Sequence, residues 1–71
     1  MFLQDEFKEK LKEALDELPV EQKDIFVMNE FDGLSFKEIS EITGLNVNTL
    51  LSRKHYAVSQ LRKKLSKYLN K

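Results

Sequence analysis

The sequence predicts an all-α fold, a small four-helix domain that contains a helix-turn-helix. Apolar residues recur at spacings of three and four along most of the 71-residue chain. Capping and helix-breaking residues divide the chain into segments of helical length. No segment shows the alternation of apolar and polar residues that is typical of a half-exposed strand. A chain of this length suits a single domain, residues 1–71, with one modest core.

A first helix is expected over about residues 4–17. Its apolar residues lie four and three apart and form one stripe: Phe7, Leu11, Leu15 and Leu18. The other positions are rich in Glu and Lys, as on a solvated helix surface. The helix should stop before Pro19, because the residue that precedes a proline is disfavoured in helical geometry.

A second helix is expected over about residues 19–31. Pro19 suits its first turn, where no backbone N–H is needed, and Gly33 is expected to cap its C-terminal end. The four consecutive apolar residues at 25–28 encircle such a helix, since successive side chains are about 100° apart. Either this helix is central to the domain, or one side of it is reserved for a partner.

A short third helix is expected over about residues 36–43. Ser35 and Glu38 are spaced as a capping box, in which each side chain accepts a hydrogen bond from the backbone N–H of the other residue. Ile39 and Ile42 are expected to face inward.

Gly44 ends the third helix, and Asn46 is the expected N-cap of a fourth helix over about residues 47–69. A short capped helix, a connection that contains Gly and a longer polar helix together form a helix-turn-helix. In that motif the second helix lies in the DNA major groove, and its N-terminal residues reach the base edges.

A projection of the fourth helix at 100° per residue separates an apolar stripe from an opposite side of polar residues. The inward stripe holds Leu50, Ala57, Leu61 and Tyr68, with Val47 and Leu65 close by. The opposite face holds Asn48, Ser52, His55, Tyr56, Ser59 and Lys63, with Thr49 at its edge. One flank, within reach of phosphates, holds Arg53, Gln60 and Lys64.

Charge is divided between the two parts of the chain, although the net charge is zero. Residues 1–44 hold 12 acids and five Lys, a formal charge of −7, whereas residues 45–71 hold five Lys and two Arg with no acid, a formal charge of +7. Favourable interaction with the helix dipole explains cations near the C-terminal end of a helix. It does not explain Arg53 and Lys54, which lie early in the fourth helix. The division indicates a polyanionic partner for the basic part.

Composition argues against several other classes of protein. There is no Cys, so disulfides and thiolate metal sites are excluded. The N-terminus lacks the apolar core of a signal peptide, and no apolar run approaches the roughly 20 residues of a membrane span. We therefore expect a soluble, cytoplasmic protein that does not enter the membrane.

An enzyme is not expected either. Gly33 and Gly44 are the only glycines and form no phosphate-binding loop. His55 has no second His or Cys with which to hold a metal, and no nucleophile at a persuasive spacing. No catalytic residue, metal or cofactor is predicted.

A resemblance to a known family rests on motifs in a fixed order. Ala14-Leu15 is followed by Leu18-Pro19, then by EQK with Ile25-Phe26, then by GLSFKEIS and TLLSR. This order resembles region 4 of bacterial RNA polymerase sigma factors, particularly of the extracytoplasmic-function type. The resemblance covers residues 14–65.

The resemblance implies an all-helical domain whose last helix recognises the promoter −35 element in double-stranded DNA during transcription initiation. The groove-reading role falls on Asn48, Thr49, Ser52, Arg53 and Tyr56. Lys37 and Thr49 would lie beside the DNA backbone. Another surface would bind the flap of the RNA polymerase β subunit, an anti-sigma factor would occlude the domain, and the isolated domain would be a monomer.

The sequence departs from the family's commonest pattern at four positions. Ser40 stands where Ala is usual, and Lys54 stands where an apolar residue is usual. Ser59 and Gln60 stand where basic residues are frequent, which implies fewer cationic contacts to DNA. Promoter melting belongs to a region of sigma factors that this chain has no room for, so a fragment of a longer protein is expected.

Two alternatives stay open from the sequence. One is another helix-turn-helix regulator, the output domain of a response regulator, which would dimerise through its last helix. The other is a protein-interaction module that binds RNA polymerase, an anti-sigma factor or another acidic partner without binding DNA.

Overall fold

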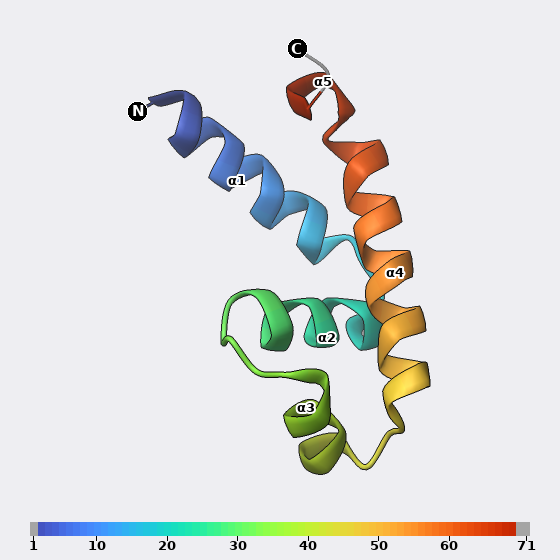
Figure 1. Cartoon of the computed structure of the whole chain (residues 1–71). Helices are drawn as coiled ribbons and strands as arrows, with labels where there is room; N and C mark the ends of the chain where they lie inside the picture. The colour runs from blue at the N-terminus through green and yellow to red at the C-terminus, as the bar shows by residue number, and fades with distance from the viewer. Residues whose placement is uncertain (1, 70–71) are drawn as a thin grey trace.

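A computed structural model describes residues 2–69, and all regular structure within them is helical (Figure 1). The elements are α1 (Phe2–Asp16), α2 (Val20–Glu30), α3 (Phe36–Thr43), α4 (Val47–Lys64) and α5 (Ser66–Leu69). None of these helices is both long enough and apolar enough to cross a membrane. The predicted all-α fold with a helix-turn-helix is confirmed.

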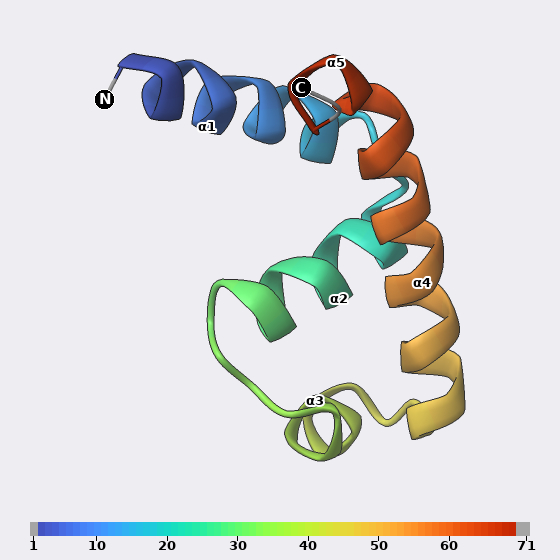
Figure 2. The same ribbon diagram turned by 45° about the horizontal axis from the view of Figure 1, so that its top comes forward.

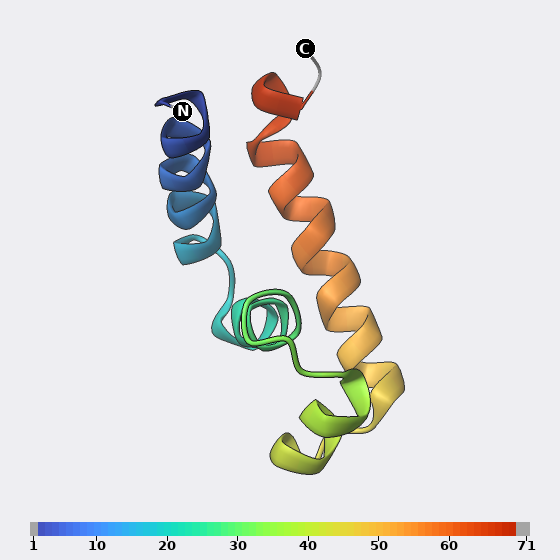
Figure 3. The ribbon, with the colours of Figure 1, turned by 60° about the vertical axis from the view of Figure 1, so that its left-hand side comes forward.

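The longest helix, α4, runs along most of the molecule, which measures 38 × 21 × 18 Å. The N-terminal part of α1 and α5 lie at one end, and α3 lies with the start of α4 at the other end (Figures 1 and 2). Seen along its own axis, α2 lies between these two ends and beside α4 (Figure 3). The helix-turn-helix therefore protrudes at one end of the domain.

The core consists of two apolar clusters, and α4 contributes to both. The larger cluster joins α1 to the second half of α4 and buries Ala14, Leu15, Leu18, Ala57, Leu61 and Leu65. The smaller cluster joins α2, α3 and the start of α4 and buries Ile25, Ile39 and Leu50. The apolar stripes predicted for the first and fourth helices are the packed surfaces, except at Val47. The expectation that Val47 belongs to the inward stripe is wrong, since it is 38% exposed at the start of α4.

The connection between α1 and α2 is tied by an ion pair. The ammonium of Lys23 donates to the carboxylate of Asp16 across 2.7 Å. This hydrogen bond and the charge of Lys23 hold the pKa of Asp16 below its ordinary value. Both groups are exposed, so the pair adds little to stability.

The second helix begins and ends one residue inside the predicted bounds of 19–31. Pro19 has an extended backbone, with ψ of 145°, and is the N-cap, so its carbonyl accepts the N–H groups of Gln22 and Lys23. Phe31 is the C-cap, and Gly33, at φ +72°, lies two residues beyond it. Hydrogen bonding around the helix ends, which apolar spacing does not report, sets these bounds.

The position of α2 agrees with its interpretation as a central helix. Ile25 is buried in the smaller cluster, and Met28 packs against that cluster. Phe26 packs against the larger cluster. The encircling apolar residues therefore join the two halves of the core.

The bounds predicted for the third helix are confirmed, as is its capping box. Ser35 Oγ accepts from the N–H of Glu38 at 3.1 Å, and a Glu38 carboxylate oxygen accepts from the N–H of Ser35 at 2.8 Å. Ile39 is fully buried, but the expectation that Ile42 faces inward is wrong, since Ile42 is 62% exposed. Ile42 lies three residues after Ile39, so its side chain is rotated by about 60° around the helix axis. Because α3 is short, neighbouring elements cover only one side of it.

The predicted continuous helix over 47–69 is interrupted at Leu65, which leaves helical geometry at φ −106° and ψ 14°. A separate turn, α5, follows and bends toward α1 (Figure 1). Leu65 is buried in the larger cluster, and the ring of Tyr68 packs edge-on against Phe7 at 6.3 Å. Packing of these two residues on α1 accompanies the break, which the pattern of α4 alone does not reveal.

Leu50 and Leu51 are adjacent on α4 and offer a matched test of the smaller cluster. Leu50 is 0% exposed, whereas Leu51 is 46% exposed. Leu50→Ala is expected to lower the free energy of unfolding by about 2–5 kcal/mol, because it removes a buried side chain and leaves a cavity. Leu51→Ala should change it by less than about 0.5 kcal/mol. Urea unfolding followed by circular dichroism measures both, and equal losses would contradict the burial described above.

Candidate nucleic-acid interface

The turn between α3 and α4 is held by side chains as well as by the backbone. Gly44 adopts the left-handed conformation, at φ +79°, and its N–H donates to the carbonyl of Ser40 at 2.9 Å. The hydroxyl of Ser40 donates to the carbonyl of Leu45 at 2.6 Å. The hydroxyl of Thr43 accepts the N–H of Leu45 at 3.2 Å. Ser40 therefore contributes a hydrogen bond that an alanine at this position could not make.

The first turn of α4 is capped as predicted. The side-chain oxygen of Asn46 accepts the N–H of Thr49 at 2.8 Å, which satisfies one of the amides that a helix start leaves without a partner. Leu50 points into the core from the same turn. Because the cap and the buried Leu50 fix the rotation of α4, Asn48 and Ser52 are held on the outer side.

Seven of the eight predicted site residues lie on α4 and form what we call the polar face. Exposed members are Asn48, Ser52, His55 and Tyr56; half-buried members are Thr49, Arg53 and Ser59. None of the seven is acidic, and the rings of His55 and Tyr56 pack edge-on at 6.1 Å. The eighth residue, Lys37, is exposed in the first turn of α3. Its helix, α3, lies at the same end of the molecule as the start of α4 (Figure 2).

A shallow hollow of about 350 Å³ extends the polar face toward the C-terminal end of α4. It is lined by His55, Val58, Ser59, Arg62 and Lys63. Arg62 was not among the predicted contacts, although the projection places it beside His55 at the edge of the polar face. Its presence in the hollow beside Lys63 adds a cation to this side of the helix.

The basic residues of α3 and α4 divide into two groups. The ammonium of Lys54 pairs with Glu30 of α2, and that of Lys64 pairs with Glu17 at 2.6 Å. For Lys37, Arg53, Arg62 and Lys63 there is no ion pair among the described residues. Four cations therefore remain for an external polyanion at the end of the molecule that carries α3 and along the outer side of α4.

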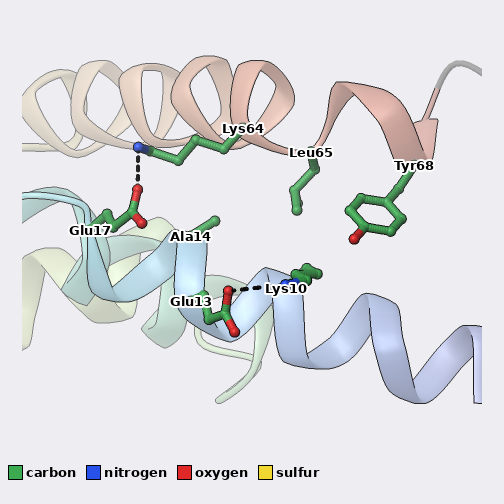
Figure 4. A pocket seen from close by; sticks show the side chains of 7 residues that line it. All are labelled: Lys10, Glu13, Ala14, Glu17, Lys64, Leu65 and Tyr68. Atoms are coloured by element: carbon green, nitrogen blue, oxygen red, sulfur yellow. Dashed lines mark hydrogen bonds and ion pairs between the residues drawn. The ribbon is translucent and has the colours of Figure 1, made fainter.

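A groove of about 290 Å³ between α1 and the end of α4 holds the Glu17–Lys64 pair (Figure 4). Lys10 and Glu13 form a second ion pair there, at 3.6 Å. The remaining lining residues are Ala14, Leu65 and Tyr68. Since these four charged groups neutralise one another, we interpret the groove as the seam between two packed helices.

Comparison with known proteins gives consistent matches. The family model described as sigma-70, region 4, matches residues 8–65. RNA polymerase sigma factor SigV of Bacillus subtilis is 46% identical over 57 residues, which are 80% of this chain and 34% of the relative. ECF RNA polymerase sigma factor SigE of Mycolicibacterium smegmatis is 40% identical over 58 residues, 82% of this chain and 23% of the relative. The chain thus spans about a third or less of the length of these relatives.

Asn46 and Asn48 provide a matched test of the cap that stabilises the first turn of α4. Asn46→Ala removes the cap and is expected to destabilise the domain by about 1 kcal/mol. Amide hydrogen exchange in the first turn of α4 should accelerate in this variant. Asn48→Ala removes an exposed side chain that makes no capping bond and should leave exchange unchanged. Equal exchange rates in the two variants would contradict a capping role for Asn46.

Proposed function

This chain belongs to the sigma-70 region 4 family, and from that premise we propose that it recognises the promoter −35 element for a bacterial RNA polymerase. The observation that carries the proposal is the polar face, an acid-free surface on a helix whose start is capped and whose inner side is buried. The role is one of binding, not catalysis, and it is exercised in the cytoplasm, where bacterial transcription takes place.

In this proposal α4 enters the major groove with its N-terminal half. Asn48 and Ser52 have short side chains that donate and accept hydrogen bonds, so they allow close approach to base edges. Arg53 contacts a base edge or a phosphate from the flank, and Tyr56 contacts a phosphate or a thymine methyl group. Each well-formed base contact contributes about 1–3 kcal/mol of discrimination between base pairs.

Backbone contacts would come from the four cations of α3 and α4 that have no ion pair among the described residues. Lys37 lies on α3, and Arg53, Arg62 and Lys63 lie along α4. If all four contact phosphates, the slope of log affinity against log salt concentration is about −3.6, at roughly −0.9 per contact. Lys54 and Lys64 are left out of this count, because each is paired with an acid within the molecule.

We further propose that a second surface binds the polymerase. An apolar groove of about 270 Å³ lies between α1 and the end of α2, lined by Lys8, Leu11, Lys12, Leu15 and Phe31. Phe31 is 58% exposed, which is unusual for an aromatic residue of a small domain. Its apolar residues and two lysines fit an apolar segment with acidic neighbours, and we propose the flap of the β subunit as that segment. An anti-sigma factor that covered the groove or the polar face would block transcription.

Substitution of Arg53 tests the DNA proposal. Arg53→Ala is expected to weaken binding to duplex DNA and to reduce the salt slope by about 0.9, the contribution of one phosphate contact. Fluorescence anisotropy over a range of salt concentrations measures both quantities. Lys23→Ala, which removes a cation paired with Asp16, should leave the slope unchanged. Unchanged affinity of Arg53→Ala at low salt would contradict the role given to this residue.

Substitution of Phe31 tests the polymerase proposal. Phe31→Ser is expected to weaken binding of the domain to polymerase core enzyme roughly tenfold, since exposed aromatic residues dominate protein interfaces. Affinity for DNA alone should not change. Val20→Ser alters an exposed apolar residue at the other end of α2, outside the groove, and is the control. Equal effects of the two substitutions on core binding, measured by biolayer interferometry, would argue against the groove as the docking site.

A further inference from the structure

Lys54 lies in the middle of α4, directly after Arg53, but its ammonium is largely removed from solvent. Its side chain is only 18% exposed. The ammonium donates to Asn29 Oδ1 and to a carboxylate oxygen of Glu30, both on the last turn of α2. A cation beside the DNA-reading residues is therefore directed into the molecule.

The surroundings of Lys54 connect several elements at one point. Its ammonium lies 5.9 Å from the ring centroid of Phe26 in α2 and 5.8 Å from that of Phe36 at the start of α3. Asn29, which accepts from Lys54, also donates to the carbonyl of Leu34 in the α2–α3 connection, at 2.9 Å. One side chain of α4 is thus joined to α2, to the connection and to α3.

These contacts compensate the charge of a side chain that is largely removed from water. Two aromatic rings and a carboxylate favour an ammonium at this place. Phe36, whose ring lies near the ammonium, packs against the smaller cluster, so Lys54 lies at the edge of that cluster. Any rotation or tilt of α4 against α2 would separate the ammonium from these groups, so the set of contacts favours one orientation of α4.

We propose that Lys54 is a positioning residue for DNA recognition, which holds α4 in the orientation that presents Ser52 and Arg53 to the major groove. It does so through Asn29, Glu30 and the two rings, and it does not contact a phosphate. This inference rests on the proposed function, because it concerns the accuracy with which the polar face meets DNA.

Glu30 distinguishes this role from a phosphate contact by the sign of its effect. If Lys54 bound phosphate, Glu30→Gln would release its ammonium and remove a nearby negative charge, so affinity for DNA would rise. If Lys54 positions α4, Glu30→Gln loosens the contact and lowers affinity for the preferred sequence. Binding to arbitrary sequences, which depends on the remaining cations, would change little.

The binding experiment uses the duplex that the unmodified domain selects from a randomised pool, and a scrambled duplex of the same composition. Lys54→Met, which keeps an apolar stem, and Glu30→Gln should each weaken binding to the selected duplex roughly fivefold. The salt slope should not change, and the double variant should lose little more than either single variant. Lys54→Arg should retain most of the affinity, because it keeps a cation.

Lys64→Met is the matched control, since it makes the same change on the same helix at an ion pair with Glu17 in the α1–α4 seam. It should leave the preference for the selected duplex intact. A rise in affinity with Glu30→Gln, or a fall of about 0.9 in the salt slope with Lys54→Met, would overturn the inference. Circular dichroism confirms that each variant is folded.

A second measurement needs no DNA and so separates this inference from the proposed function. Residual dipolar couplings of backbone amides report the orientation of α4 relative to α2. In Lys54→Met this orientation should change or become averaged, whereas in Lys64→Met it should match the unmodified domain. An unchanged orientation in Lys54→Met would overturn the inference. Failure of the domain to select any duplex would instead count against the proposed function.

Discussion

Leu50 packs with Ile25 and Ile39 where three helices meet, and the positions of all the DNA-facing groups depend on this contact. Because Leu50 faces inward from the first turns of α4, the residues on the opposite side of the helix must face outward. Since Ile39 enters the same cluster from α3, the angle between the two helices of the helix-turn-helix is set there as well. The capping box and the Asn46 cap fix where each helix begins, and Leu50 fixes how α4 is rotated.

The basic residues of α4 serve two purposes that charge counting alone does not separate. Lys54 pairs with Glu30 of α2, and Lys64 pairs with Glu17, which follows α1. These two pairs hold the recognition helix to the rest of the domain. Arg53, Arg62 and Lys63 have no such acidic partner among the described residues and face outward for a polyanion. The domain therefore places Glu17, Glu30 and part of its positive charge in contacts that orient α4, and other cations of α4 remain for binding.

Most features that arise from local chemistry were predicted correctly, because the residues responsible lie within four positions of one another. The expected cap at Gly33 is an exception, since Phe31 is the C-cap of α2. Examples of correct predictions are the capping box at Ser35, the Gly44 and Asn46 caps, and the acid-free outer side of α4. Other features arise from contacts between distant segments and left no local signal. The break at Leu65 accompanies packing on α1, and the inward direction of Lys54 depends on Asn29 and Glu30, more than twenty residues away. Ile42 shows that helical spacing identifies a face of a helix, but not how much of that face is covered.

The most direct test of this account is a two-dimensional amide NMR titration of the domain with a pool of random-sequence duplexes at low salt. Docking through the helix-turn-helix predicts shifts confined to about residues 35–37 and 46–60, where α3 begins and the polar face lies. The amides of α1 should not shift. Absence of shifts even at millimolar DNA, or shifts centred on the α1–α2 groove, would contradict the account, because α4 would then serve a partner other than DNA.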